Sequence, residues 1–196
     1  MAVYTRVYDT YADAEAAVRD LETAGIPADD ISLVANKYVS EEYAEVSDAS
    51  AAASGAGLGA LAGGGAGLLA GVGLLAIPGL GPVVAAGWLA ATAAGAAAGA
   101  AAGGLIGALV EAGTPEEEAH VYSETVRRGG TLLTVRNDTA EPPVVNAILD
   151  RHHPVDTGIR RTEYEQGGWK QYDPAAPVYT PSEAEIERIR RRRQSS

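Results

Sequence analysis

The chain contains no cysteine and no phenylalanine among its 196 residues, and aromatic residues make up only 6% of it. The absence of cysteine excludes disulfides, thiolate catalysis and cysteine-ligated metal sites. Although 46% of the residues are hydrophobic, many of them are alanines, which have little side chain to bury. The chain therefore lacks the residues for a large core of the usual composition.

Basic residues are also scarce, since 15 lysines and arginines face 26 aspartates and glutamates, for a formal net charge of -11. A chain this acidic repels nucleic acid, so no nucleic-acid partner is expected. Residues 1–9 alternate in character and do not form a basic stretch followed by an apolar core, so they do not resemble a signal peptide. We expect the protein in the cytoplasm or on the cytoplasmic side of a membrane.

Charge is missing altogether from Ala49 to Val110, and glycine recurs there at nearly every fourth position. Residues four apart share one face of a helix, so this spacing predicts a seam without side chains. Glycine costs roughly 1 kcal/mol per helical position relative to alanine, and close packing of two helices would offset that cost. The predicted helix-packing residues are Gly55, Gly59, Gly63, Gly67, Gly71, Gly87, Gly95, Gly99, Gly103 and Gly107.

We expect this uncharged run to form a glycine-zipper helical hairpin, with helices over 51–77 and 83–110 and a Pro/Gly turn between them. Each helix would measure roughly 40 Å, which exceeds the bilayer core of about 30 Å. The weak hydrophobicity of alanine and glycine and the acidic flanks argue against insertion. Burial between the subunits of a homo-oligomer is the alternative. The length criterion favours transmembrane helices.

The remaining sequence predicts a β-α-β unit on each side of the hairpin. The expected strands are 3–7, 31–35, 131–136 and 155–162, and the expected helices are 10–21, 114–128 and 143–152. This order predicts an α+β fold, a ferredoxin-like sandwich interrupted between strands two and three by the hairpin and one extra helix. The predicted divisions are 1–48, 49–112, 113–165 and 166–196, of which the first and third are the two halves of the ferredoxin-like domain.

The last division, 166–196, predicts an extended C-terminal arm that ends in a short basic helix. Trp169, Tyr172 and Tyr179 lie among prolines and glycines, so their apolar area needs a groove on this or another subunit. The basic residues are Arg188, Arg190, Arg191, Arg192 and Arg193. A solvated tail, contact with anionic lipid headgroups and contact with the acidic face of another subunit all fit this pattern.

Residues that could carry chemistry do not form a recognisable site. Residues 55–60 fit a relaxed dinucleotide-binding pattern, but no hydrophobic strand precedes them and no acid follows before Glu111. The three histidines lack the spacing of metal ligands, and Ser123, His120 and Asp138 lack a nucleophile-elbow motif. We therefore assign no catalytic, cofactor-binding or metal-binding residue, and expect a non-enzyme without cofactors.

Several separated motifs occur in an order that is typical of one protein family. They are Val7-Tyr8-Asp9, the stretch Gly113–Tyr122, the stretch Val126–Leu133, Ile148–His152, Pro154-Val155-Asp156 and Gly168-Trp169. In this order they resemble bacterial general stress proteins of the heat-induced, YflT-like type. The resemblance implies a stress-associated protein, often labelled a membrane protein, whose molecular activity is not established. It carries no site residues to this chain.

The sequence as a whole predicts a non-enzymatic general-stress protein, a membrane-associated scaffold that assembles through its glycine-zipper helices. The alternative is a soluble homo-oligomeric binding module, or a small-ligand sensor, with the hairpins buried between subunits. Both hypotheses make a second copy of the chain the expected partner. Membrane lipid is a partner in the first hypothesis alone, and the sequence identifies no small-molecule ligand.

Overall fold

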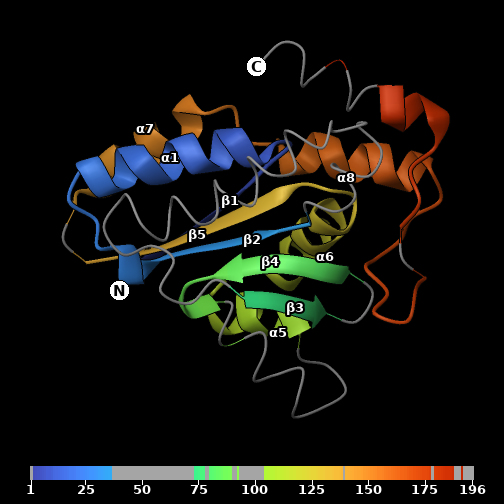
Figure 1. Cartoon of the computed structure of the whole chain (residues 1–196), viewed down its shortest axis with the longest axis horizontal. Helices are drawn as coiled ribbons and strands as arrows, with labels where there is room; N and C mark the ends of the chain where they lie inside the picture. The colour runs from blue at the N-terminus through green and yellow to red at the C-terminus, as the bar shows by residue number, and fades with distance from the viewer. Residues whose placement is uncertain are drawn as a thin grey trace.

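The computed structural model describes residues 2–36, 73–77, 80–89, 92, 104–138, 140–177, 179–187 and 191. Its centre is a five-stranded antiparallel sheet in the order β1-β5-β2-β4-β3 (Figure 1). The strands are β1 (Ala2–Tyr8), β2 (Ile31–Ala35), β3 (Gly73–Ile77), β4 (Gly81–Ala86) and β5 (Thr131–Asn137). The predicted α+β class is confirmed.

The first β-α-β unit forms as its sequence predicts. The side chain of Thr10 accepts a hydrogen bond from the backbone N–H of Asp13, 3.1 Å away, and so caps helix α1 (Tyr11–Thr23). Gly25 follows the C-cap residue of this helix and has a φ of 88°, which glycine adopts without strain. A short 3-10 turn, η1 (Ala28–Asp30), leads into β2. Strand β5 then inserts between β1 and β2 and is antiparallel to both.

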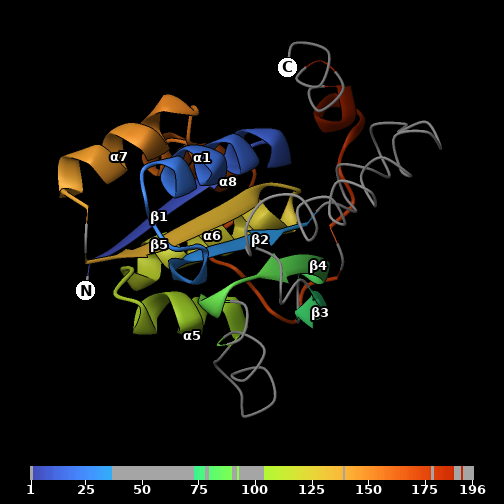
Figure 2. The ribbon, with the colours of Figure 1, turned by 60° about the vertical axis from the view of Figure 1, so that its left-hand side comes forward.

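Two helical layers cover the two faces of the sheet (Figure 2). On one face, α1 and α7 (Pro142–Arg151) pack on the side of the sheet that carries Leu33 and Leu133. On the other face, α5 (Gly104–Glu111) and α6 (Glu116–Arg127) pack on the side that carries Val34 and Leu132. The period-two alternation of side chains along β2 and β5 therefore divides the interior into two cores.

The predicted helical hairpin is wrong on both sides of its turn, because residues 73–77 and 81–86 form the antiparallel strands β3 and β4, whereas the helix predicted over 83–110 is confirmed at its end by α5. The two prolines and two glycines between Ile77 and Val83 break a helix, and the backbone N–H of Leu80 instead donates to the Ile77 carbonyl to close a turn. Val83 and Val84 are β-branched and favour an extended backbone. Strand β4 then pairs with β2.

These strands also correct the prediction of transmembrane helices. They occupy parts of both predicted spans that contain leucine, isoleucine and valine, the residues that a transmembrane span requires. In the part of the chain that the structure describes, no helix has the length and apolar character needed to cross a membrane. The membrane and transmembrane-helix predictions are therefore not supported by the fold.

Of the predicted seam glycines, only Gly87 and Gly107 lie within the described residues. Gly107 is part of helix α5, whereas Gly87 follows β4 and is not helical. At Gly87 the backbone has a φ of 86° and lies directly against the backbone of β2. The other predicted positions fall outside the described residues: Gly55, Gly59, Gly63, Gly67, Gly71, Gly95, Gly99 and Gly103.

The fourth predicted strand, 155–162, is also wrong, because helix α8 (Thr157–Gln166) takes its place. The Asp156 side chain caps this helix by accepting a hydrogen bond from the backbone N–H of Ile159 at 2.9 Å. One strand-like contact remains, since the backbone N–H of Val155 donates to the Val7 carbonyl of β1 at 2.8 Å. Asp156 is a typical N-cap residue and indicated a helix, but the alternation of residues 155–162 suggested a strand.

The close approach at Gly87 generates the first prediction. A Cβ at this position would overlap the carbonyl oxygen of Ile31 and lie 2.7 Å from the Ser32 Cα, so we expect Gly87→Ala to lower the free energy of unfolding by about 2–4 kcal/mol. Gly25→Ala is the matched control, because Gly25 has a φ of 88° but no atom within 4 Å of the position that a Cβ would take. The control should lose about 1 kcal/mol. Equal losses in urea denaturation would contradict the close contact of Gly87 with β2.

Candidate functional site

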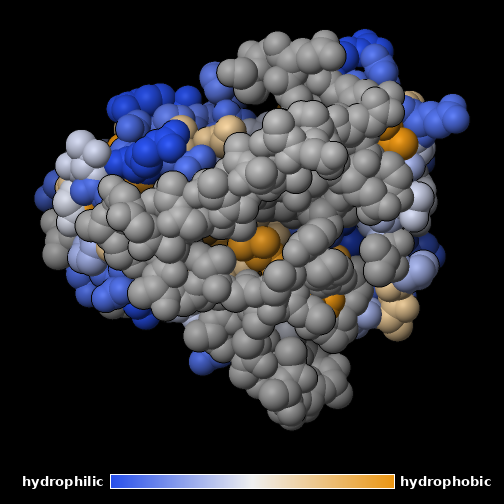
Figure 3. Space-filling model, in the orientation of Figure 1, coloured by the Kyte–Doolittle hydropathy of each residue, from blue (hydrophilic) through white to orange (hydrophobic). Residues whose placement is uncertain are grey.

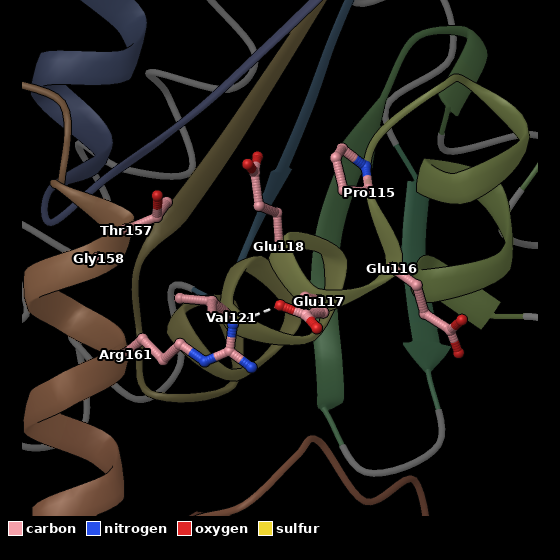
Figure 4. Close-up of a pocket in the computed structure, with 8 residues that line it drawn as sticks. All are labelled: Pro115, Glu116, Glu117, Glu118, Val121, Thr157, Gly158 and Arg161. Atoms are coloured by element: carbon pink, nitrogen blue, oxygen red, sulfur yellow. Dashed lines mark hydrogen bonds and ion pairs between the residues drawn. The ribbon is translucent and has the colours of Figure 1, made fainter.

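A pocket of about 320 Å³ lies between the first turns of α6 and α8 (Figure 4). Its lining consists of Pro115, Glu116, Glu117, Glu118, Val121, Thr157, Gly158 and Arg161. Arg161 forms ion pairs with Glu117 at 2.9 Å and with Glu165 at 3.1 Å. The pocket thus lies where α8 packs against α6, and the Arg161–Glu117 ion pair joins the two helices there.

The three glutamates at the start of α6 do not converge on a common point in this pocket. Figure 4 shows Glu117 turned toward Arg161, whereas Glu116 and Glu118 point in other directions. Acidic residues in a first turn are favourable through the helix dipole without any ligand. Among the described residues no group of three His, Asp or Glu side chains could hold a metal ion. The pocket therefore presents paired charges and a helix start, and no assembled cation site.

A second cluster of charges lies at the opposite end of α6. Glu124 is only 1% exposed, and Arg127 forms a bidentate pair with its carboxylate at 2.9 and 2.8 Å. The Nε of Arg128 donates to the same carboxylate at 2.6 Å. We call Glu124, Arg127 and Arg128 the arginine cluster. Burial of an unpaired carboxylate costs free energy, so Arg127 and Arg128 are needed to compensate the charge of the buried Glu124.

Tyrosines from the C-terminal part of the chain cover the arginine cluster. The ring of Tyr179 lies 4.9 Å from each guanidinium of Arg127 and Arg128, and the ring of Tyr164 lies 4.3 Å from that of Arg128. The Glu185 carboxylate accepts a short hydrogen bond from the Tyr179 hydroxyl and lies 3.6 Å from Arg128. Aromatic faces attract such cations. Tyr179 and Glu185 of the arm therefore contact the arginine cluster directly.

The arm also reaches the core, which the predicted division at residue 166 did not anticipate. Tyr172 is buried in the same core as α5 and α6, and Trp169 makes an edge contact with Tyr164 at 5.6 Å between ring centroids. Tyr172 and Tyr179, whose apolar area the sequence predicted to need a groove on this or another subunit, contact this chain's own core and its arginine cluster respectively. The described part of 167–187 has no regular secondary structure apart from turns and the short helix that ends it.

The predicted basic contact residues follow Glu185 in the sequence. Only Arg191 falls within the described residues, where it is exposed and pairs with Glu187 at 3.3 Å. Arg188, Arg190, Arg192 and Arg193 lie outside the described residues. The predicted contact of these arginines with an anionic surface therefore stays a prediction.

The serine, histidine and aspartate considered as catalytic residues differ in burial and have different contacts. Ser123 is fully buried in α6, Asp138 is exposed after β5, and His120 is half-buried, 4.0 Å from Glu116. His152 instead lies 3.0 Å from Asp20, and this contact, with that of Arg151, holds the pKa of Asp20 below its usual value. These contacts join α7 to α1 rather than forming a catalytic set.

A third feature is a set of uncharged residues contributed by strand β3 and helix α5. In α5 the residues Leu105, Ala108 and Leu109 are buried, but Val110 is 43% exposed and Ile106 is only partly buried. The start of α5 lies against the end of β3, since a Cβ on Gly104 would be 4.0 Å from the Ile77 side chain. We call β3 with Ile106, Gly107 and Val110 the uncharged rim.

Charge elsewhere on the molecule contrasts with this rim. Figure 3 shows mostly hydrophilic side chains over α1 and α7. A helix that is apolar on nearly all sides, as α5 is until Glu111, is normally buried on all sides. The sequence alone shows the lack of charge over 49–110. From it we predicted two long helices, whereas the described part of the run also contains strands β3 and β4. Among the described residues, the exposed large hydrophobic side chains are Val110, Val144 and Ile159, at 43%, 46% and 63%, and of these Val110 alone belongs to the uncharged run 49–110.

Comparisons of the chain with family models, with curated proteins and with solved structures found no match. The resemblance to heat-induced general stress proteins therefore stays a prediction. The geometry of this chain is then the main basis for its function.

The arginine cluster generates a second prediction. Glu124→Gln leaves two guanidinium groups without their buried counter-charge, so we expect it to lower the free energy of unfolding by about 3 kcal/mol. Glu185→Gln is the control, because this carboxylate is more exposed and contacts Arg128 alone of the two arginines, so about 1 kcal/mol is expected. Urea denaturation followed by tyrosine fluorescence measures both. A neutral Glu124→Gln would show that the cluster does not hold the arm to α6.

Buried tyrosines give a third prediction, on stability at high pH. Burial raises the pKa of Tyr122 to about 12, and its hydroxyl lies 3.4 Å from the Thr5 carbonyl oxygen. Because the unfolded chain loses this proton near pH 10 and the folded chain retains it, stability should fall as the pH rises from 10 toward 12. Tyr122→Phe should lessen that fall by about 1.4 kcal/mol per pH unit at most. The measurement is urea denaturation of both proteins from pH 8 to about 11.5, and identical slopes would refute the assignment.

Proposed function

We propose that this chain is a non-enzymatic, stress-associated protein that works as a homo-oligomeric scaffold, with its copies joined at the uncharged rim. The observation that carries the proposal is the rim itself, an apolar helix face and a strand edge without charge. The stress association rests on the resemblance of the sequence motifs alone. The proposal that the partner is a second copy of the chain rests on the lack of charge on the two surfaces that would meet and on the apolar area that their contact would bury.

Electrostatics favours this rim over the rest of the surface as a contact between copies. With a formal net charge of -11, two copies repel each other across most orientations. The rim residues themselves carry no charge and so add no like-charge repulsion to the contact, and the next acid in the sequence is Glu111 at the end of α5. Contact would also remove Val110 and Ile106 from water, worth roughly 25 cal/mol per Å² of apolar area. Self-association at this rim therefore combines low repulsion with apolar burial.

We also propose that β1, α1, β2, β5 and α7 derive from a ferredoxin-like unit. The support is the order β1-β5-β2, with both helices on one face, which is the arrangement of a split β-α-β unit. The bond between Val155 and Val7 lies where a fourth strand of that unit would pair with β1. The hairpin of β3 and β4 extends the sheet on its other side.

The proposal makes a fourth prediction, on the mass of the protein in solution. Val110→Glu places a carboxylate on the rim of each copy, and we expect it to weaken self-association at least about tenfold, seen as a shift to the mass of one chain in analytical ultracentrifugation. Val144→Glu is the matched control, because Val144 is 46% exposed, close to the 43% of Val110, but lies on α7 across the sheet. Its mass should equal that of the wild type.

Two results would contradict the proposal. One is a wild-type protein with the mass of a single chain at every concentration tested. The other is an equal loss of association in both variants, which would show that the added charge acts through the net charge of the chain and not through the rim.

A further inference from the structure

We infer that strand β3 of one copy pairs antiparallel with β3 of a second copy, so that two five-stranded sheets join into one continuous sheet. The inference rests on the proposed self-association and names the contact that produces it. It follows from a difference between the two edges of the sheet, β1 and β3.

The β1 edge is blocked by contacts within the chain. The Thr5 carbonyl oxygen accepts hydrogen bonds from the Arg6 side chain at 3.0 Å and from the Tyr122 hydroxyl at 3.4 Å. The Val7 carbonyl oxygen accepts the backbone N–H of Val155 at 2.8 Å. Arg6 in turn pairs with Asp150 at 3.0 Å. Bound carbonyls and charged side chains are the means by which sheets prevent another strand from adding to an edge.

The β3 edge carries none of these protections in its sequence. Its five residues, Gly-Leu-Leu-Ala-Ile, include no lysine, no other charged residue and no proline. Within the residues that the structure describes, β3 pairs with β4 alone. An unprotected apolar edge presents a row of backbone donors and acceptors, and a further strand can satisfy them. Among the described residues, one edge of the sheet is thus protected and the other is available.

A second copy is the occupant that fits this edge best. Antiparallel pairing of a strand with its own copy is a two-fold contact, in which the same surface of both partners is used and association closes at the dimer. The start of α5 lies beside Ile77 at the end of β3, so the same rotation brings the start of this helix in both copies near the junction. A charged foreign strand would find no opposite charge on β3 to bind, because the edge and the rim residues of α5 are uncharged.

Hydrogen exchange of the full-length wild-type protein tests the pairing at the backbone. Peptides that contain residues 73–77 should exchange about tenfold more slowly in concentrated solution, where the dimer forms, than in dilute solution where single chains prevail. Peptides from β1 should exchange at the same rate in both, because their edge contacts lie within the chain.

A pair of alanine-to-lysine variants provides the matched comparison. Ala76→Lys places a charge on the β3 edge and should abolish both the dimer and the concentration-dependent protection of residues 73–77. Ala2→Lys places the same charge on β1 and should leave both unchanged. If Ala76→Lys does not fold, the wild-type exchange experiment still decides the question.

Each remaining outcome counts against the pairing in a distinct way. If the wild type self-associates and Val110→Glu breaks it, but exchange of 73–77 does not change with concentration, the pairing is wrong and the proposed scaffold stands. If residues 73–77 are protected even in dilute single chains, another segment of the same chain covers the edge. If the wild type stays a single chain at all concentrations, the proposed function and the pairing both fail.

Discussion

The pairing of β2 with β4 is the contact on which the rest of this structure depends. It joins an uncharged run to a sheet that is otherwise built from the charged parts of the chain. The Ser32 hydroxyl donates to the Ala86 carbonyl at 2.7 Å, and Gly87 allows the chain to leave β4 directly against β2. Just beyond, the Arg136 guanidinium lies 4.8 Å from the Trp88 ring and pairs with Asp30 at 3.1 Å. Without this junction, β3 would not be an edge and α5 would not have a core to cover.

The molecule therefore separates its charged and uncharged contacts. At the end of α6, the arginine cluster and two tyrosines hold the C-terminal arm, and Asn36 connects this end to the β3–β4 turn. Its side-chain amide donates to the Leu80 carbonyl at 3.0 Å and to the Arg127 carbonyl at 3.3 Å. Charges are satisfied there inside the chain, whereas the uncharged rim has apolar groups still partly exposed. In this account the arginine cluster stabilises the fold of one chain, and the uncharged rim mediates association between chains.

The sequence predicted the parts of the fold that local signals determine, and failed where tertiary pairing decided. Thr10, the alternation of Ile31–Ala35 and the Thr131 strand indicated the correct β1, α1, β2 and β5. The four-residue glycine spacing suggested helices over 51–77 and 83–110, but the residues that flank the predicted Pro/Gly turn form strands, because Val83 and Val84 favour an extended backbone and β2 offers an edge. At the site, Glu124, Arg127 and Arg128 have the i, i+3, i+4 spacing of a helical charge cluster, and only the burial of Glu124 distinguishes it from a surface one. No local pattern reports that burial.

The most direct test of this account is an NMR measurement of backbone contacts between residues 31–35 and 81–86. The antiparallel register pairs Leu33 with Ala86 and Ala35 with Val84, so cross-strand nuclear Overhauser effects should link these two segments. They should be present in the single chain and in the oligomer alike, because the pairing lies within one copy. Contacts between residues three and four apart within 81–86, without cross-strand effects, would show a helix. That result would contradict the sheet junction and, with it, the open β3 edge.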